Sequence, residues 1–584
     1  MTNSLTLTLS QREMESPRRT LTLSQRESEN EPALECDVLV GGGGLAGLSA
    51  AIEAARSGAS VLVASKGRAG HSGNTVVAGS QFAAVVPYPG SEDSPREHFP
   101  DTMAGGRGMN DERLVRLLVD GAGPQLRVLE EWGVRFFRSE CELVRRTPPG
   151  HRFPRGIPVD NSAFPVVVGG LAISKPLLAT AHRRGVRFLD DAPVIRLVVE
   201  DGEVGGAVAL DLRSEQLVPI RARSVVVTAG GGGRLYANTN NTRGISGDSY
   251  GLLLQAGATL RDMEFVQYYP CQMTSPFKVV IASPVFGDGA VLRNRHGERF
   301  MPRYDPANGE MATRDVMARA IFYEVRGGNG VDGEVYVDCT AIPEAVLQKK
   351  YLTLARDLRQ RGIDMTREWI KVGITTHFFM GGAEVDEACR TRVGGLFAAG
   401  EAAGGVHGAN RLSGNALSEA AVFGAIAGRA AAEHARHRSV LPDVRPISLA
   451  LEPAGSGSES LHAVRAELRK AMWNHVSIVR SAASLSAALS SVRECAAALD
   501  RCPAPTTAEV ARREETRLMA LAAEAVILSA QARAESRGAH FREDFPEAQD
   551  RWLGNHRVWL ADGTLQVAFV GKSGTTRTRR HEET

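Results

Sequence analysis

The chain has 584 residues, of which 43 % are hydrophobic and 23 % are charged, and its net charge is only +2. A chain of this length can bury two or three domain cores, and its balanced charge gives no electrostatic basis for binding nucleic acid or a membrane surface. No apolar run is long enough to cross a bilayer. The seven cysteines form no CxxC pair, which argues against a disulfide framework or a bound iron–sulfur cluster, and we expect a protein of the reducing cytoplasm.

The first residues differ in character from the rest of the chain. The heptapeptide Leu7–Glu13 recurs as Leu21–Glu27, and neither copy has the apolar core of a signal peptide. We expect residues 1–34 to be a disordered extension, either translated from a start site placed too early or serving as a short functional arm.

A glycine turn then organises the chain. The apolar strand Val38–Val40 leads into a GxGxxG turn and an alanine-rich helix. Glycines permit a tight turn and close backbone approach, and a helix N-terminus attracts phosphate. A glycine turn can also serve only to close a βα unit, but the strand and helix that flank this one favour a dinucleotide site. The expected pyrophosphate-binding residues are Gly42, Gly43, Gly44, Leu45, Ala46 and Gly47.

The second strand, Ser60–Ala64, ends without the acidic residue that usually binds the ribose of NAD. The chain continues instead with Ser65 and Lys66. A hydroxyl, an amine or backbone groups must therefore hold the ribose or adenine, which weakens an NAD interpretation and leaves FAD open.

Three later stretches fit the same interpretation. Small and polar residues over Gly70–Ala84 would let the backbone lie flat against an isoalloxazine ring, although such a stretch can also be a plain loop. Ala222–Gly233 is another strand that enters a glycine turn. The apolar stretch Ala416–Ala435 is interrupted by charged residues, so we expect a buried helix there.

The order of further motifs resembles the flavoprotein subunits of succinate dehydrogenase and fumarate reductase, a family that includes L-aspartate oxidase. Together the matches cover roughly residues 35–555. The motifs are Gln267–Pro270, Gly297–Met301, Ala312–Arg319, Thr376–Gly382, Gly395–Glu401, His407–Leu417 and Glu535–Pro546.

This resemblance implies an α/β fold, with a Rossmann-like FAD-binding domain, an inserted α+β capping domain and a helical C-terminal domain. The expected parts are a disordered extension (1–34), the FAD-binding domain in two pieces (35–270 and 372–440), the capping domain (271–371), a linker (441–460), the helical domain (461–559) and a loose tail (560–584).

The resemblance also implies which residues contact FAD. Ser65 and Lys66 would lie at the adenosine end, Asp248 and Glu401 would contact the cofactor, and Asn415, Ala416 and Leu417 would present a helix start to the flavin ring. Such a helix N-terminus would stabilise negative charge on the reduced flavin. Glu401 could instead be a purely structural carboxylate.

In membrane-bound relatives a histidine in a Ser-His-Thr sequence carries FAD covalently. Alignment of Thr75 with that threonine puts Asn74 at the histidine position, while His71 falls three residues early. We therefore expect FAD to bind non-covalently, with Asn74 and Thr75 among the residues that contact it, and attachment to His71 as the alternative.

The family reaction moves a hydride between flavin N5 and the Cα–Cβ bond of an organic acid, and it moves a proton to or from the neighbouring carbon. By resemblance, Arg314 transfers the proton, and His377 and Arg411 bind a carboxylate. Each residue alone could be structural, but the three matched motifs together favour these roles.

Several positions depart from the family pattern. Tyr269 stands where a second carboxylate-binding histidine is expected, and Ala282 replaces a substrate-binding threonine. Ser283 and Phe286 replace the Glu and Arg that relay protons to the catalytic arginine. Because an unpaired buried carboxylate costs several kcal/mol, we expect the substrate not to be a simple dicarboxylate. A monocarboxylate or an aromatic acid fits better, and Asp288 or Asp315 could supply another proton path.

We therefore predict an FAD-dependent dehydrogenase or reductase acting on the CH–CH group of an organic acid. Three alternatives remain: an amino-acid oxidase like L-aspartate oxidase, a flavoprotein subunit that works only with an iron–sulfur or other electron-transfer partner, and a flavoprotein that has lost catalysis. We expect neither a metal site nor a nucleic-acid partner.

Overall fold

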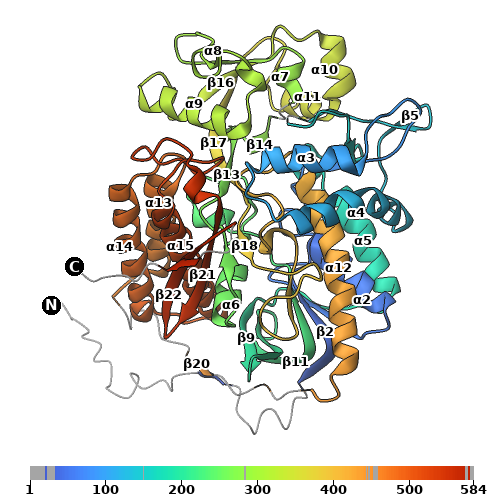
Figure 1. Ribbon diagram of the computed structural model, residues 1–584, viewed down its shortest axis with the longest axis vertical. Coiled ribbons are helices and arrows are strands. Elements are labelled where there is room, and N and C mark those ends of the chain that lie inside the picture. Colours follow the sequence, from blue (N-terminus) through green and yellow to red (C-terminus); the bar gives the residue numbers. More distant parts are fainter. Residues whose placement is uncertain are drawn as a thin grey trace, which may run out of the picture.

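The fold is described from a computed structural model (Figure 1). Three parts can be told apart in it: a sheet between helices in the lower half, a capping domain at the top, and a helical group at the left. The structure describes residues 20–22, 33–79, 81–148, 150–281, 284–441, 444, 448–450, 458–572 and 576–578.

The largest sheet carries the glycine turn. Its strand order is β8-β3-β2-β11-β10-β9, with β19 also paired to β11. β2 is parallel to both β3 and β11, whereas β10 is antiparallel to β11. β3 and the end of β11 are continuous buried apolar runs, as expected for strands covered by helices on both faces. The bounds are β2 Leu34–Gly41, β3 Val61–Ala64, β8 Arg187–Leu189, β9 Val194–Glu200, β10 Glu203–Asp211, β11 Gln216–Val227 and β19 Leu396–Ala398.

Two helices, α2 (Leu45–Arg56) and α12 (Asn415–His437), pack tightly on each other beside this sheet. A Cβ at Gly424 would lie 2.4 Å from Ala46 O, and the backbones can approach because the glycine has none. α12 is the buried helix that the sequence predicts, and among the described helices none is long and apolar enough to cross a membrane. The other helices of this part are α3 Pro95–Gly105, α4 Glu112–Glu131, α5 Leu171–Arg183 and α6 Asp248–Gln255.

The capping domain is built on an antiparallel sheet with the strand order β14-β13-β17-β16-β15. Strands β13 and β17 pair with each other, and the register of this ladder shifts between Gln267 and Tyr268. The expected domain limits at 270 and 372 fall inside these two strands, which therefore run from the FAD-binding domain into the cap. The bounds are β13 Val266–Met273, β14 Val279–Val280, β15 Val291–Arg293, β16 Val335–Asp338, β17 Ile370–Phe379, α7 Pro284–Gly287, α8 Met301–Tyr304, α9 Arg314–Arg326, α10 Glu344–Lys350 and α11 Leu352–Arg359.

The C-terminal part contains three long helices followed by a β-hairpin. The expected loose tail from residue 560 is wrong over residues 560–571, because β21 and β22 pair as a hairpin and β21 also pairs with β12. Asp562 and Gly563 form its turn with positive φ angles of 48° and 74°. The bounds are α13 Leu461–Val476, α14 Ala482–Ala498, α15 Thr507–Ala532, β12 Leu260–Arg261, β18 Gly382–Ala383, β21 Gly554–Ala561, β22 Thr564–Gly571 and β23 Thr576–Thr578.

Two short strands fall in segments that the sequence analysis expected to be irregular. β1 (Thr20–Thr22), in the expected disordered extension, pairs antiparallel with β20 (Ser448–Ala450), in the expected linker. Most other residues of 1–34 and 441–460 lie outside the described residues, so these two expectations stay predictions there.

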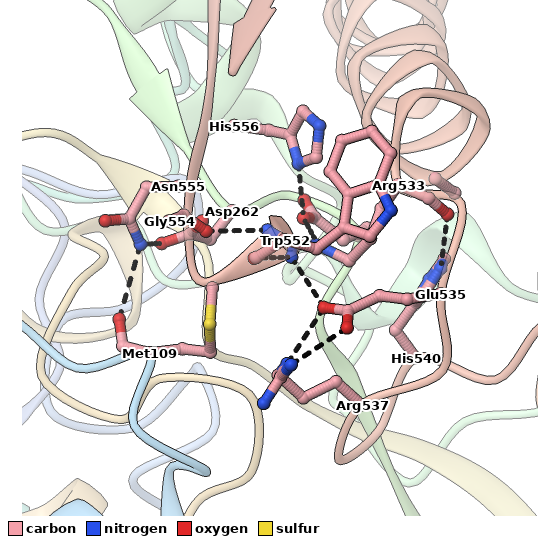
Figure 2. A network of polar contacts seen from close by, with 12 residues as sticks. Met109, Asp262, Arg533, Glu535, Arg537, His540, Trp552, Gly554, Asn555 and His556 are labelled. Atoms are coloured by element: carbon pink, nitrogen blue, oxygen red, sulfur yellow. Dashed lines mark hydrogen bonds and ion pairs between the residues drawn. The ribbon is translucent and has the colours of Figure 1, made fainter. Parts of the chain in front are cut away.

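A buried ionic network anchors the C-terminal hairpin to the segment that leads into β13 (Figure 2). Arg533 is fully buried, and it donates to Glu264 Oε1 at 2.6 Å and to Glu535 Oε1 at 3.0 Å. It also donates to the carbonyl groups of Trp552 and Gly554, each at 2.9 Å. Three chain segments therefore share one guanidinium, which holds the start of β13 against the C-terminal part.

Candidate active site

The glycine turn lies between β2 and α2 and is packed too closely for any other residue. A Cβ at Gly42 (φ +121°) would lie 2.5 Å from Thr228 O, and one at Gly47 would lie 1.9 Å from Gly42 O. The first turn of α2 contains no acidic side chain. Among the described residues, the N–H groups of Ala46 and Gly47 have no hydrogen-bond partner. The positive end of this helix thus fits an incoming pyrophosphate.

Thr75 supports the same turn. Its Oγ1 accepts a hydrogen bond from the N–H of Leu45 at 2.9 Å, and it lies 3.2 Å from where a Cβ of Gly44 would be. A Cβ at Gly43 would lie 2.6 Å from the Cβ of Ala69. The structure therefore places Thr75 at the glycine turn, and its predicted contact with the cofactor stays a prediction.

Lys66 and Asp248 meet at the end of β3. Lys66 Nζ lies 2.9 Å from Asp248 Oδ2 and 2.5 Å from Glu515 Oε1, and it donates to Ser246 Oγ at 2.7 Å. Although burial opposes it, the two carboxylates raise the pKa of Lys66. Ser65 is buried at the same strand end. Glu515 comes from α15, and no local sequence signal could have found a partner so distant along the chain.

Asn74 and Glu401 lie close to the segment around His377, and their side chains interact with each other. Asn74 Nδ2 donates to Asn241 Oδ1 at 2.7 Å, and Asn241 Nδ2 donates to the carbonyl oxygen of His377 at 2.9 Å. Glu401 Oε1 accepts from the N–H of Phe379 at 3.0 Å. Burial raises the pKa of Glu401 to about 7. The structure thus brings two predicted cofactor residues next to a predicted substrate residue.

The start of α12 holds the side chain of Asn415 away from any cofactor, and the predicted contact of this helix start with the flavin stays a prediction. The Asn415 side chain is turned to the protein interior, where its Oδ1 lies 3.1 Å from His98 Nε2 and its Nδ2 donates to Thr102 Oγ1 at 3.2 Å. Only its backbone is left for a cofactor. Ala416 and Leu417 are half-buried, and the first turn carries no acidic residue.

Arg314 and Arg411 share one acceptor. Gln267 Oε1 accepts from Arg411 Nη2 at 2.8 Å and from Arg314 Nη1 at 3.2 Å. Arg314 comes from the cap at the start of α9, Arg411 from the loop before α12, and Gln267 from β13. Arg314 also lies over the ring of Tyr269, with 4.8 Å from Cζ to the ring centroid, and Arg411 lies over Phe378 at 4.7 Å.

Neither arginine pairs with a carboxylate of the described residues. In the part of the chain that the structure describes, no acidic side chain lies within ion-pair distance of either guanidinium. Burial and the positive charge of Arg314 lower the pKa of Arg411 to about 9, and burial lowers the pKa of Arg314. The pair is thus a site of concentrated positive charge with no described carboxylate at ion-pair distance, although Glu401 and Glu419 raise the pKa of Arg411 from farther away.

His377 lies beside this pair as a neutral imidazole. Burial, Arg411 and Arg314 hold its pKa well below the usual range. Its Nδ1 lies 3.0 Å from Asn240 Nδ2 and 3.2 Å from Asn240 Oδ1, and Asn240 Oδ1 also accepts from Asn241 Nδ2 at 3.1 Å. The Asn240 side chain therefore holds the ring through Nδ1, while Nε2 has no partner among the described residues.

Tyr269, which the sequence analysis places at the position of a second carboxylate-binding histidine, lies beside His377, and its predicted place among the catalytic residues stays a prediction. Its ring meets that of His377 edge to face, with 5.2 Å between centroids, and its hydroxyl donates to the carbonyl oxygen of Ile281 at 3.1 Å. Phe286 is buried in the core of the cap. Ala282 and Ser283 lie outside the described residues.

The two acidic residues considered for a proton path have different surroundings. Asp288 pairs with Lys350 Nζ at 2.5 Å and accepts from Tyr351 Oη at 2.5 Å, on the partly exposed side of the cap. Asp315 is buried and accepts from Asn410 Nδ2 at 3.1 Å, next to the arginine pair. Sequence reasoning missed Asn410 and Gln267, because neutral amides carry no ionisable signal.

Comparisons with known proteins agree with this geometry. Residues 37–417 match the family described as FAD binding domain, and residues 465–576 match the one described as fumarate reductase flavoprotein C-term. A fumarate reductase (CoM/CoB) subunit from Methanothermobacter marburgensis is 40 % identical over 552 residues, which cover 92 % of this chain and 99 % of that protein.

Two further proteins are similar over most of their length. The L-aspartate oxidase of Pseudomonas aeruginosa is 34 % identical over 535 residues, covering 88 % of this chain and 96 % of that protein. A solved structure of a mutant of Escherichia coli quinol fumarate reductase superposes with a TM-score of 0.83 at 29 % identity, covering 92 % of this chain and 96 % of that one.

The cradle, the arginine pair and these matches define an FAD-dependent oxidoreductase that acts on CH–CH groups. Its fold is the α/β FAD-binding architecture with a capping and a helical region, as the sequence predicts. The chain belongs to the family of fumarate reductase and succinate dehydrogenase flavoproteins, to which L-aspartate oxidases are also related. The predictions of this family and of FAD as the cofactor are confirmed.

Proposed function

We propose that this flavoprotein interconverts the single and double bond next to a carboxylate in an organic acid, and that Arg314, Arg411 and His377 bind that carboxylate. The observation that carries the proposal is the pair of guanidinium groups that have no counter-ion among the described residues. They share only the neutral oxygen of Gln267, at 2.8 and 3.2 Å.

Two cations buried side by side are costly, because both lose hydration and each repels the other. A substrate carboxylate relieves both costs, since it can accept charge-assisted hydrogen bonds from both groups. In the tautomer that carries its proton on Nε2, in which Nδ1 accepts from Asn240 Nδ2, neutral His377 adds a third donor. The site is therefore complementary to an anion.

FAD, when bound, supplies the hydride acceptor or donor of this reaction. The protein supplies the rest: the three donors orient the acid, and Arg314 holds the proton for the neighbouring carbon. Its lowered pKa makes it a better proton donor than an ordinary arginine.

We propose a substrate with a single anchoring carboxylate. Tyr269 offers an aromatic ring and directs its hydroxyl at Ile281 O, so it supplies no cation for a second carboxylate. Desolvation of such a group against apolar side chains would cost several kcal/mol.

Fumarate is the second candidate substrate, because several similar proteins are named fumarate reductases. L-Aspartate is a third, because L-aspartate oxidases are similar as well. Hydrogen peroxide formed on addition of L-aspartate would support that activity.

The experiment compares fumarate with crotonate, in which a methyl group replaces one carboxylate. Protein with reduced flavin is mixed anaerobically with each acid, or with cinnamate, and the absorbance of oxidised flavin is followed. We expect crotonate or cinnamate to reoxidise the flavin faster than fumarate. Saturated acids and L-aspartate are added to the oxidised protein in parallel.

The matched variant is Arg411→Met, which should keep FAD and lose roughly 10²-fold or more of the rate. If fumarate reoxidises the flavin faster than crotonate and cinnamate, the substrate is a dicarboxylate and the proposal of a single anchoring carboxylate is wrong. Absence of any reaction in either direction would contradict the proposed function.

We further propose non-covalent FAD and a separate electron-transfer partner. Asn74, at the expected attachment position, is held by Asn241 and Thr242, and the nearby His71 lies 3.1 Å from Ala69 O through Nδ1. Acid precipitation should release all of the FAD, whereas flavin that stays on the protein and is lost in His71→Ala would show a covalent bond. Relatives named as subunits support an iron–sulfur or other redox partner. The seven free thiols support a reducing compartment such as the cytoplasm.

A further inference from the structure

Three polar side chains form a hydrogen-bonded row that ends at the arginine pair. The row begins at Asp315, in the first turn of α9. Asp315 Oδ1 accepts from Asn410 Nδ2 at 3.1 Å, and Asn410 Oδ1 accepts from Gln267 Nε2 at 2.8 Å. Gln267 Oε1 then accepts from Arg411 and Arg314. These three side chains, Asp315, Asn410 and Gln267, are called the amide chain below.

The groups at the two ends of the amide chain require the same donor-to-acceptor direction for its hydrogen bonds. A guanidinium can only donate and an ionised carboxylate can only accept. The carboxylate of Asp315 therefore requires the NH₂ of Asn410, which turns the oxygen of Asn410 toward the NH₂ of Gln267. As a result, the oxygen of Gln267 faces the two arginines.

Gln267 has no freedom to turn within this arrangement. Its Nε2 also donates to Arg411 O at 2.9 Å, so both donors and both lone pairs of the amide are used. Gln267 and Asn410 are 1 % and 4 % exposed. A reversed amide would place an NH₂ group against two cations and leave each of them without an acceptor.

The surroundings of Asp315 leave little room for solvent to replace it. Among the described residues, its Oδ2 accepts only from Arg319 Nη2, at 3.4 Å. The adjoining cavity has a volume of about 10 Å³, which is the lower limit for one water molecule. Its lining residues are Gln267, Tyr268, Asp315, Ala318, Arg319, Ile478 and Ala539.

We propose that Asp315 is a positioning residue, which acts through Asn410 and Gln267 to hold Arg314 and Arg411 ready for the substrate carboxylate. The proposal rests on the proposed function of the arginine pair. It separates Asp315 from Asp288, the other acidic residue considered in the cap, which pairs instead with Lys350 and Tyr351.

The test is a double-mutant cycle in which the carboxylate and the amide of positions 315 and 410 are exchanged. In Asp315→Asn, the amide chain has no carboxylate to fix the direction of its hydrogen bonds. In Asn410→Asp, the carboxylates at positions 315 and 410 face each other. In the double variant Asp315→Asn/Asn410→Asp, the new carboxylate at position 410 accepts from both Gln267 and the new amide at 315, so the direction is restored. We expect each single variant to lose roughly tenfold or more in kcat/KM for the best acid. The double variant should return to within about threefold of the wild type.

Asp288→Asn serves as the matched control and should keep the wild-type kcat/KM and KM. Wild-type kinetics in Asp315→Asn would overturn the proposal, as would a double variant no better than the single ones. A residue needed only for stability would not be rescued by the exchange. Thermal unfolding of all variants shows whether they fold.

Crystal structures make the result independent of activity. Asp315→Leu should lose the contact between Gln267 Oε1 and Arg411, and the double variant should keep it. An unchanged contact in Asp315→Leu would overturn the positioning role. If the wild type neither reacts with nor binds any carboxylate, the proposed function is wrong. The crystal structures of the variants still show whether Asp315 positions Gln267 and Arg411.

Discussion

Gln267 shows how a neutral side chain can hold two like charges together. Its oxygen lies within 3.2 Å of both guanidiniums, which lessens their repulsion but leaves the net charge of the pair unchanged. A glutamate of the same shape would neutralise one cation and compete with the substrate. The amide is therefore the group that keeps the pair available for an anion.

This reasoning predicts the effect of Gln267→Glu. The new carboxylate should ion-pair with Arg314 and Arg411, because it replaces the neutral acceptor without change of shape. We expect the KM for the acid substrate to rise roughly 10- to 100-fold while the FAD content stays the same. Steady-state kinetics and the flavin-to-protein ratio measure both quantities.

Gln267→Met is the control, because it removes the acceptor without adding charge. It should disorder the arginines and lower kcat as well as raise KM. If Gln267→Glu binds acids as tightly as the wild type, the arginine pair is not the carboxylate site.

The raised pKa of Glu401 leads us to expect that the free energy of unfolding of the cofactor-free protein depends on pH. Its pKa is raised from 4.5 to about 7 by burial. Between these values the folded carboxyl group keeps a proton that the unfolded one has released, so stability falls as the pH rises through this window. Glu401→Gln removes this loss, while its amide oxygen can still accept from Phe379 N–H.

The free energy of unfolding of Glu401→Gln, relative to the wild type, should therefore increase from pH 5 to pH 8 by an amount on the order of 3 kcal/mol. Denaturant titrations of the cofactor-free proteins measure it. Glu140→Gln, at an exposed surface position, should show no such trend. A pH-independent difference would contradict a buried, protonated Glu401.

The sequence predicts charged residues of the site better than neutral ones. Arg314, His377 and Arg411 lie in matched motifs, and the structure brings them together. Gln267 lies in such a motif too, but its partners Asn410 and Arg411 are more than 140 residues away along the chain, and Arg314 is 47 residues away. Its role depends on tertiary contacts that no local pattern records.

At the scale of elements, the ionic network of Figure 2 does the most to join distant segments. Glu264 and Glu535 are fully buried and both pair with Arg533, while His556 also contacts Glu264 and Arg537 also pairs with Glu535. Arg533→Met should lower the free energy of unfolding by roughly 3–5 kcal/mol, because it removes a buried cation that two buried carboxylates share. The midpoint of denaturant unfolding measures this loss.

Arg551→Met is the matched control, since Arg551 is exposed and close to the same hairpin. It should change the free energy of unfolding by no more than about 0.5 kcal/mol. Equal effects of the two substitutions would mean that the network contributes little.

The C-terminal hairpin is the element that the sequence analysis missed. The basic end of the chain suggested a loose tail, yet Asp562 and Gly563 form a dipeptide that strongly favours a two-residue hairpin turn. Alternating apolar residues flank it in β21 and β22. The Asp-Gly turn was therefore visible in the sequence, but the basic charge of the last residues led to the prediction of a loose tail.

Gly563→Ala tests this turn. Gly563 has a φ of +74°, and none of the described atoms beyond its chain neighbours lies within 4 Å of the position that a Cβ would take, so only backbone strain opposes the substitution. We expect a loss of about 1 kcal/mol in the free energy of unfolding. Gly244→Ala, where space is equally open and φ is not in the left-handed region, should be close to neutral.

At the scale of the whole molecule, the site forms where three parts of the chain meet. The cap contributes Arg314, and the FAD-binding domain contributes Arg411. The C-terminal part reaches the amide chain through Arg319 of the cap, whose Nη1 donates to Gly538 O at 3.3 Å. Neither domain alone contains a complete carboxylate site.

The shared strands β13 and β17 have a mechanical consequence. They are the continuous ladder between the two domains, so a rotation of the cap must bend this ladder where its register is interrupted. The register shifts between Gln267 and Tyr268 and again between Tyr269 and Gln272. The first of these irregularities lies at the residue that contacts both arginines, so we expect a rotation of the cap to disturb the anion site at Gln267.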